Sequence, residues 1–273
     1  MGNLLKFIFL VLPIFILVNC SEYNKIVKGT DYQLKYKKAV EYYEKGDCYK
    51  SLPLFEELMS YFRMTDKGED VYYYYAKTQY CMGDYYLAGY YFKRFSKNFP
   101  NSSRAEECAF NSAFCYMKNS PEYNLDQSDT YKAIDEFQLF MNRYPSSELV
   151  DSCNVLIKDL RKKLELKSYE QAQLYYKMEK YRSARIAFKS TLEIFPDTKF
   201  REEILFMIVK SNFMYASNSI DLKKAERFEE TINSYNIFVD SFKNSRHRKI
   251  AESYFNTCLK EIEKLNNLNQ NGI

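Results

Sequence analysis

Residues 83–102 read GDYYLAGYYFKRFSKNFPNS, and this stretch contains the pattern that decides the fold. A small residue, Ala88, is followed four positions later by the aromatic Phe92 and twelve positions later by Pro100. The same spacing recurs at Ala133, Phe137 and Pro145, and again at Ala184, Phe188 and Pro196. Self-similarity of this kind is the sequence signature of a repeat protein.

Two weaker copies of the pattern lie outside these three. Ser51 precedes Phe55 and Thr231 precedes Tyr235, and the expected prolines are replaced by Arg63 and Lys243. Successive small residues are 37, 45, 51 and 47 positions apart, whereas a tetratricopeptide repeat has a period of about 34. We therefore expect insertions or longer helices in the later repeats.

Short turns separate the two helices of each repeat. Gly46-Asp47 and Gly83-Asp84 precede two of the second helices. Glycine supplies the positive φ of a helix C-cap, and aspartate can cap the helix that follows. Residues 179–181 repeat this turn without a glycine. Small residues in the first helices allow the two helices of a pair to approach closely, and they are Ala39, Ala76 and Ala172.

These features predict an all-α fold, a right-handed superhelical solenoid of about five tetratricopeptide-like helix pairs with a C-terminal capping helix. The predicted pairs span residues 31–64, 67–98, 102–143, 147–194 and 198–242. The capping helix covers 245–266, and residues 267–273 form a flexible tail. Apolar side chains spaced by three and four residues from Leu149 to Leu164 favour one continuous helix to about residue 178.

The first 19 residues resemble a lipoprotein signal peptide. Lys6 precedes an apolar run over 7–18, which is too short for a helix that crosses a bilayer. The run ends at Leu17-Val18-Asn19-Cys20, which predicts acylation of Cys20 and a lipidated tether over 20–30. Asn19 departs from the usual small residue at that position. The alternative is an ordinary secretory signal in which Cys20 has no role.

Composition argues against an enzyme and against a nucleic-acid-binding protein. The 40 basic and 36 acidic side chains are interleaved along the chain, whereas nucleic-acid binders concentrate their basic residues. Neither a phosphate-binding loop nor a serine-hydrolase elbow is present, and His247 is the single histidine. We expect no cofactor and no metal, apart from covalent lipid on Cys20.

Six cysteines follow Cys20, and they are Cys48, Cys81, Cys108, Cys115, Cys153 and Cys258. None forms a CxxC pair, so a zinc site is poorly supported. Export would permit disulfides. The favoured interpretation is that all six are small buried side chains on helix faces.

An unusual segment interrupts the third pair over residues 119–130. Ser120-Pro121 ends a helix, and Asp126, Ser128 or Asp129 can cap the next one. A long ordered loop on a rigid scaffold suggests a functional role, but a role in capping and packing explains the segment equally well.

Four elements of the chain resemble BamD, the family of lipoprotein subunits of the outer-membrane β-barrel assembly machine, in its Bacteroidetes-type form. The elements are Cys20-Ser21-Glu22-Tyr23-Asn24-Lys25, Phe99-Pro100-Asn101-Ser102 with Ala105-Glu106, the run from Ser120-Pro121 through Leu125-Asp126-Gln127 to Tyr144-Pro145, and Phe195-Pro196-Asp197-Thr198. The Pro-x-Ser and Leu-Asp-Gln elements are more specific than the repeat pattern itself.

The resemblance implies a lipid-anchored protein on the periplasmic side of the outer membrane. It implies binding to the POTRA region of a BamA-like barrel protein, and receipt of unfolded outer-membrane proteins through an aromatic-ended terminal strand. Substrate would then contact the N-terminal repeats and BamA the C-terminal repeats.

Two surfaces follow as hypotheses. A tyrosine-lined groove for substrate would use Tyr36, Tyr43, Tyr72, Tyr73, Tyr74, Tyr75 and Tyr80. Because four successive residues on a helix face different directions, at least one of Tyr72–Tyr75 should be exposed; ordinary packing is the competing explanation. The second surface is a partner contact that includes Arg246, Arg248 and Lys249.

A different binding function also fits the sequence. The chain could be another envelope lipoprotein of the same fold that binds glycan or peptidoglycan, or that coordinates envelope proteins. A glycan binder would expose flat aromatic rings, whereas an assembly factor would co-purify with a large barrel protein.

Overall fold

The computed structural model describes residues 22–270, and every regular element in this part of the chain is an α-helix. The helices are α2 (Tyr32–Glu44), α3 (Cys48–Tyr61), α4 (Gly68–Cys81), α5 (Tyr85–Asn98), α6 (Ala105–Asn119), α7 (Ser128–Arg143), α8 (Val150–Lys177), α9 (Tyr181–Ile194), α10 (Arg201–Ser217), α11 (Asp221–Ser241) and α12 (Arg248–Gln270). The predicted signal peptide and the acylated Cys20 lie outside the described residues.

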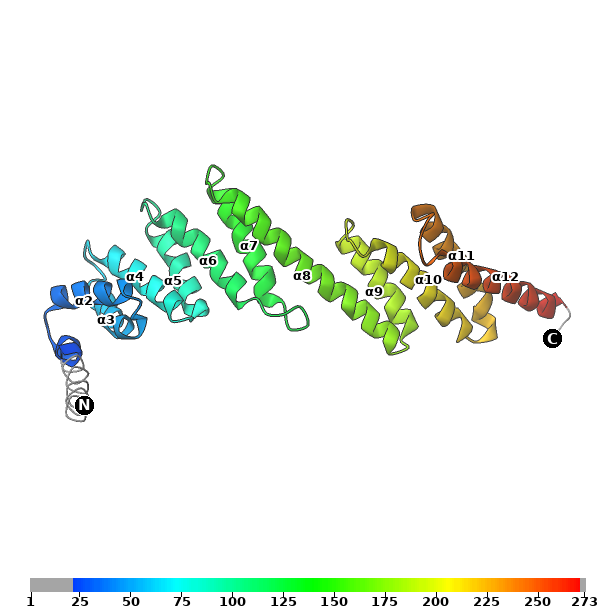
Figure 1. The fold of residues 1–273 in the computed structure, drawn as a ribbon, viewed down its shortest axis with the longest axis horizontal. Helices are drawn as coiled ribbons and strands as arrows, with labels where there is room; N and C mark the ends of the chain where they lie inside the picture. The colour runs from blue at the N-terminus through cyan, green and yellow to red at the C-terminus, as the bar shows by residue number, and fades with distance from the viewer. Residues whose placement is uncertain (1–21, 271–273) are drawn as a thin grey trace, which may run out of the picture. The chain divides into compact units, whose positions relative to one another are not determined.

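The helices follow one another as antiparallel hairpins (Figure 1). Five pairs, from α2–α3 to α10–α11, are followed by α12. The prediction of an all-helical, tetratricopeptide-like fold is confirmed, while the right-handed winding stays a prediction. α8 is one helix of 28 residues, as the apolar spacing from Leu149 predicts.

The ends of the chain differ from the expectation. Residues 22–28 of the expected tether are helical, and Ile26 is buried against the first helix pair. α12 continues to Gln270, whereas a flexible tail was expected from residue 267. At the N-terminal end, the packing of Ile26 against the first pair accounts for the additional helix.

The chain divides into two compact units, which are described separately. The N-terminal unit contains the described residues up to Leu160, and the C-terminal unit begins at Arg161. In the N-terminal unit each helix from α2 to α7 packs against its neighbours in sequence, and in the C-terminal unit α9 to α12 do the same.

The repeated small and aromatic residues build the core of each pair. Ala88, Ala133 and Ala184 are fully buried. The aromatic side chain four residues later, at Phe92, Phe137 or Phe188, is at most 1% exposed. Because a small residue lets two helices approach, the next aromatic ring can fill the space beside the contact.

The turns inside three of the pairs share one backbone conformation. Gly46 and Gly83 have positive φ angles of 76° and 81°, as the Gly-Asp dipeptides predict. Glu179 has the same conformation, with φ 59°, at the turn that lacks glycine. The Asp84 side chain caps α5 by accepting a hydrogen bond from the Leu87 backbone, whereas Asp47 makes no such bond to α3.

A second repeated junction joins one pair to the next, two residues after each proline. Ser102, Ser147 and Thr198 each accept a hydrogen bond from the backbone nitrogen two residues later. Each hydroxyl also donates to a glutamate on the preceding first helix, and these acceptors are Glu69, Glu106 and Glu165. The Pro-x-Ser element therefore orders the turn before a helix and ties that turn to the preceding pair.

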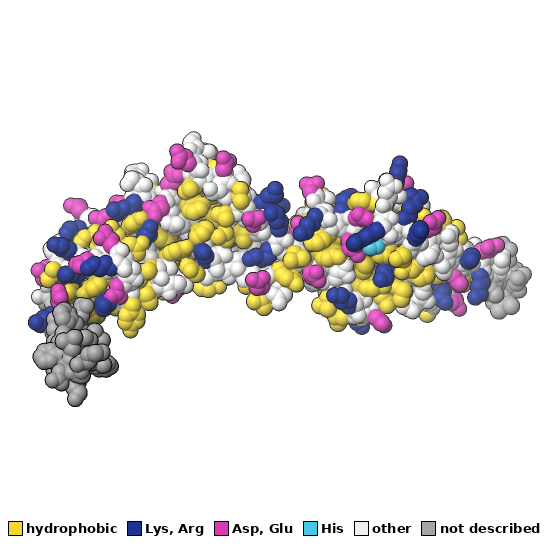
Figure 2. Space-filling view, viewed as in Figure 1, with side chains coloured by type: hydrophobic (Ala, Val, Ile, Leu, Met, Phe, Trp, Pro, Cys, Tyr) yellow, Lys and Arg dark blue, Asp and Glu magenta, His cyan; other side chains and the backbone are white. Residues whose placement is uncertain are grey.

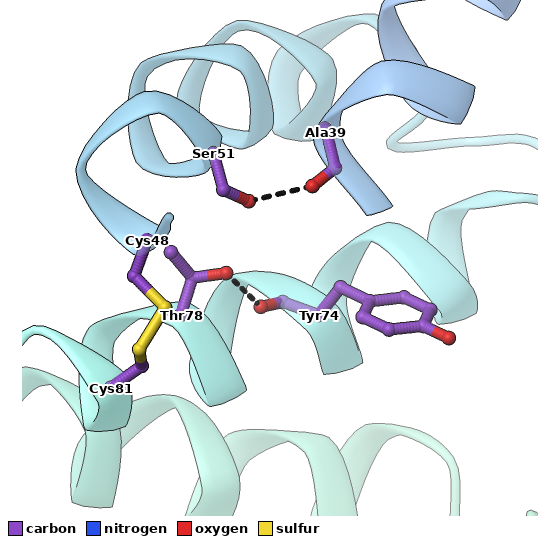
Figure 3. The surroundings of a disulfide bond; sticks show 6 residues. All are labelled: Ala39, Cys48, Ser51, Tyr74, Thr78 and Cys81. Carbon is purple, nitrogen blue, oxygen red and sulfur yellow. Dashed lines mark hydrogen bonds between the residues drawn. A yellow bond between two sulfur atoms is a disulfide. The ribbon is translucent and has the colours of Figure 1, made fainter. Parts of the chain in front are cut away.

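A disulfide joins Cys48 at the start of α3 to Cys81 at the end of α4 (Figure 3). Their Cα atoms are 6.2 Å apart, although 33 positions separate them in sequence. The expectation of six buried side chains on helix faces is therefore wrong for Cys81, which is exposed and bonded to Cys48. Packing brings the two helix ends together, which the sequence spacing does not reveal. Cys108, Cys115, Cys153 and Cys258 are free and buried, as expected.

Candidate functional site

Tyrosine side chains gather on the first helices of the first two pairs. Tyr36 and Tyr43 lie on α2, seven residues apart, and Tyr73 and Tyr80 have the same spacing on α4. Residues seven apart on a helix share a face. Lys77 lies four residues after Tyr73 and three before Tyr80, so it shares their face of α4. We call the surface formed by these four tyrosines and Lys77 the tyrosine face.

Hydrogen bonds link the tyrosine face to the next first helix. Glu107 on α6 accepts from the Tyr73 hydroxyl at 2.9 and 3.0 Å and from Lys77 at 3.1 Å. Arg104 pairs with Asp70 and lies over the Tyr73 ring, 4.5 Å from its centre. A network of this kind fixes the spacing of α4 and α6 and holds these side chains in place.

The seven predicted substrate-binding tyrosines are less accessible than expected. Tyr75 is buried, and the other six are half-buried. The expectation that at least one of Tyr72–Tyr75 is exposed is wrong, because α4 has packed neighbours on several sides. Tyr72 and Tyr75 contact Tyr91 on α5, and Tyr74 contacts Phe55 on α3.

Burial also makes ionisation of these phenols less favourable. Desolvation raises the pKa of Tyr36, Tyr72, Tyr73 and Tyr75 to about 12, and raises the pKa of Tyr43 and Tyr80. All of them therefore remain neutral at physiological pH and can both donate and accept hydrogen bonds. A face of this chemistry suits apolar and polar groups together.

The accessible edge of the tyrosine face lies on α2. A shallow cavity of about 440 Å³ is lined there by Tyr36, Lys37, Val40, Glu41 and Glu44. Tyr36 is held at its inner end by an edge contact with Phe62 and by Lys67 over its ring. Tyr36 therefore combines a fixed ring with access to this cavity.

A cavity that the sequence did not predict lies between α5, α6 and α7. It measures about 220 Å³ and is lined by Lys93, Ser96 and Lys97 of α5, Ala109 and Ser112 of α6, and Glu136, Leu139, Phe140 and Arg143 of α7. Lys93 pairs with Glu136, and Arg143 donates to the Ser96 carbonyl at 3.0 Å. No local motif indicates it, because three helices contribute the lining.

The long loop after α6 is held from within. Gln127 is buried, and its amide donates to the carbonyls of Glu122 and Leu125 at 2.8 and 3.1 Å. Its side-chain oxygen accepts from Thr130 at 2.7 Å, and Asp126 accepts from the Ser128 backbone. These bonds support the capping and packing interpretation, while Leu125 stays 55% exposed at the tip.

The predicted basic partner surface is exposed on the C-terminal unit. Arg246, Arg248 and Lys249 are all exposed. Arg246 reaches Glu203 at 3.4 Å, and Arg248 donates to the Lys243 carbonyl at 2.7 Å. His247 contacts Glu203 at 2.8 Å and stacks on the Phe206 ring. These contacts hold the stretch against α10 and leave its cations accessible.

Metal-binding groups, membrane-spanning helices and surface charge are the remaining features of the described residues. Among residues 22–270, no group of three or more histidine, cysteine or acidic side chains could hold a metal ion. Within the same range, no helix has the length and apolar character needed to span a membrane. On the face shown in Figure 2, Lys and Arg side chains are interspersed with Asp and Glu.

Comparison with known proteins places these features in a family. The family model described as YfiO, outer membrane lipoprotein, matches residues 29–228. A curated protein of Aquifex aeolicus (strain VF5), provisionally named outer membrane protein assembly factor BamD, is 23% identical over 267 residues, which is 97% of this chain and 87% of that protein. The family match covers both units and the junctions between repeats. The chain therefore belongs to the YfiO family of outer membrane lipoproteins.

Proposed function

We propose that the chain is an assembly factor for outer-membrane proteins, a non-enzymatic scaffold that faces the periplasm and is anchored through acyl chains on Cys20. The alignment with the Aquifex protein over nearly the whole chain carries this proposal. The series of helix pairs supports it, because helical repeats present extended surfaces for protein ligands. The disulfide supports an oxidising compartment such as the periplasm.

The two surfaces have different proposed ligands. The tyrosine face binds unfolded outer-membrane proteins, whose aromatic side chains pack on half-buried phenols such as Tyr36. The basic stretch on the C-terminal unit contributes to the contact with the POTRA region of a BamA-like barrel protein, through Arg246, Arg248 and Lys249. Exposed cations favour an acidic complementary surface.

The first test is a mild-detergent pulldown of the acylated protein from its own envelope, with the bound proteins identified by mass spectrometry. Near-stoichiometric recovery of a barrel protein with POTRA domains is expected. Recovery of glycan or of unrelated envelope proteins instead would favour a different envelope function for the same fold. Cys20→Ser serves as the control for anchoring, because it should release the chain from the membrane fraction.

Charge reversal tests the partner surface. Arg246→Glu combined with Arg248→Glu and Lys249→Glu should reduce recovery of the barrel protein at least tenfold, since like charges across an interface repel. The matched control reverses three other exposed cations of the same unit, Arg182, Lys189 and Lys260. Equal recovery with both triple variants would remove the basic stretch from the proposal.

Aromatic truncation tests the tyrosine face. Tyr36→Ala with Tyr43→Ala should weaken binding of an unfolded outer-membrane protein by about tenfold or more, because each lost aromatic pair contributes about 0.5–1.5 kcal/mol beyond its buried area. The control truncates Tyr86 and Tyr131, which are 61% and 57% exposed on the second helices α5 and α7. A similar loss in both variants would argue against a specific face.

A further inference from the structure

A cavity lies beside the first described helix, between residues 22–28 and the start of α2. It measures about 260 Å³ and is lined by Glu22, Lys25, Ile26, Gly29, Asp31, Leu34, Lys35 and Lys38. We call it the N-terminal cavity. All of its lining belongs to the N-terminal unit, at the end of that unit where Figure 2 shows Lys and Arg mixed with Asp and Glu.

Three ammonium groups line this cavity. The Lys35 side chain is only 2% exposed, and it donates to Glu57 at 2.5 Å. Lys38 lies 3.0 Å from Glu41 and 3.9 Å from Glu22. Lys25 is exposed and forms no ion pair with any other described residue. Because Lys35 is paired with Glu57, it can be buried and form a fixed cation in the wall of the cavity.

Acidic and apolar groups share the same wall. Glu22 is exposed, while Asp31 caps α2 by accepting from the Leu34 backbone at 3.0 Å. Ile26 is buried, and Leu34 is 44% exposed. The lining therefore contains three cations, two carboxylates and an apolar edge. A nearly balanced lining of this kind fits a ligand that carries both signs of charge better than a simple anion.

We propose that the N-terminal cavity binds the headgroup of a membrane phospholipid that carries both a phosphate and a primary ammonium group. Lys25, Lys35 and Lys38 offer donors to the phosphate, and charge-assisted bonds of this type are strong. Glu22 accepts from the ammonium group. Leu34 contacts the glycerol end of the lipid, where the apolar part begins.

The position of the cavity in the chain identifies a lipid as the ligand. Glu22 is two residues from Cys20, and two residues of extended chain span at most about 7 Å. Acyl chains on Cys20 would thus hold the cavity within the headgroup layer of the bilayer. This step rests on the proposed acylation, because an anchor at Cys20 would keep the cavity at the membrane surface.

Vesicle binding tests the proposal without the anchor. The mature chain, residues 20–273 with Cys20→Ser, is sedimented with vesicles of phosphatidylcholine alone, with added phosphatidylethanolamine, or with added phosphatidylglycerol. We expect the highest partition coefficient with phosphatidylethanolamine, because its ammonium can donate hydrogen bonds to Glu22 and the quaternary group of choline cannot. Soluble phosphoethanolamine should compete for this binding.

Two variants separate the roles of the charges. Lys25→Gln with Lys38→Gln should lower the partition coefficient on phosphatidylethanolamine vesicles by about tenfold, because two charge-assisted contacts to phosphate are lost. Glu22→Gln should remove the preference for ethanolamine over choline. The control, Lys223→Gln with Lys224→Gln, changes two ion-paired lysines of the C-terminal unit and should bind like the unmodified chain.

Other outcomes overturn the proposal. Equal binding to choline and ethanolamine vesicles would show that the cavity does not select this headgroup. Stronger binding to phosphatidylglycerol, equally reduced in the control, would indicate general surface charge. Circular dichroism of each variant checks that its helices are retained. The mass of the native protein reports acylation of Cys20 separately, so a failure of the anchor is distinguishable from a failure of the cavity.

Discussion

The pairs α4–α5 and α8–α9 use the same repeat pattern with different chemistry next to the small residue. In α5 the residue after Ala88 is Gly89, and a Cβ built on it would lie 3.0 Å from the Cβ of Cys115 on α6. In α9 the residue after Ala184 is Arg185, which pairs with Glu230 on α11 and approaches Asn212 on α10. The small residue and the aromatic ring fix the pair, while the neighbouring position is free to vary.

The two units also differ in how they are reinforced. The N-terminal unit has a disulfide between adjacent pairs and glycine at both of its Gly-Asp turns. In the C-terminal unit the corresponding turn places Glu179 in the left-handed conformation, and Cys258, the cysteine of that unit, is free. Each difference leads to a variant with a matched counterpart in the other unit.

The largest effect is expected from truncation of the repeated aromatic ring. Phe92→Ala and Phe188→Ala should each destabilise its own unit by about 3–5 kcal/mol, because both rings are buried and each truncation leaves a cavity. Hydrogen exchange resolved by peptide checks this. Phe92→Ala should accelerate exchange in α4–α6 and Phe188→Ala in α8–α10. Loss of protection across both units in either variant would show that they unfold together.

Removal of the disulfide should affect the N-terminal unit alone. Cys48→Ser with Cys81→Ser removes the covalent loop from the unfolded chain. For a sequence separation of 33 residues, the chain-entropy model predicts that the free energy of unfolding falls by about 3–4 kcal/mol. Denaturation with and without reductant measures the loss. Reductant should leave the C-terminal unit unchanged, and Cys258→Ser in that unit serves as the matched control. Thiol counting by mass spectrometry would contradict the disulfide if it found six free thiols after Cys20.

Substitution of the residue after the small residue, Gly89 in α5 and Arg185 in α9, should change stability by different amounts in the two units. Gly89→Leu introduces a side chain into a tight helix contact and should cost about 1–3 kcal/mol through overpacking. Arg185→Leu should cost only about 1 kcal/mol, because Glu230 is 44% exposed and can be solvated after losing its partner. Thermal unfolding of both variants gives the comparison. Equal losses would mean that the Arg185 network contributes as much as close packing does.

The smallest effect is expected at the turns. Glu179→Gly should stabilise the C-terminal unit by about 1 kcal/mol, since left-handed conformation costs other L-residues roughly 1–2 kcal/mol. Gly83→Ala should destabilise the N-terminal unit by a similar amount, although open space surrounds its Cβ position. Denaturation midpoints measure both changes. A change of the same sign in both variants would exclude backbone strain as the cause.

Much of the repeat architecture was predictable because its signals are local. The spacing from Ala88 to Phe92 and Pro100 reports side chains on one helix and the turn that follows it. The Gly83-Asp84 turn and the continuous α8 helix were predictable for the same reason. The Pro-x-Ser element was recognised as a motif, but its bond to a glutamate on the preceding first helix required the packed repeats.

The candidate sites were less predictable because several helices contribute to each one. The sequence indicated that one of Tyr72–Tyr75 should be exposed, since adjacent residues on a helix diverge. In the structure α3, α5 and α6 all supply partners to these rings. Neither the 220 Å³ cavity over α5–α7 nor the N-terminal cavity has a continuous motif.

The sequence by itself determined that this protein is helical and repetitive, because helix periodicity and turn chemistry act over four to twelve residues. Its short motifs also resemble an outer-membrane lipoprotein family. Tertiary structure decided which cysteines meet, how far the tyrosines are buried, and where Lys35 lines a cavity. Those outcomes depend on contacts between residues about 20 to 35 positions apart, such as Lys35 with Glu57 and Cys48 with Cys81. Only packing of the helices brings such residues together.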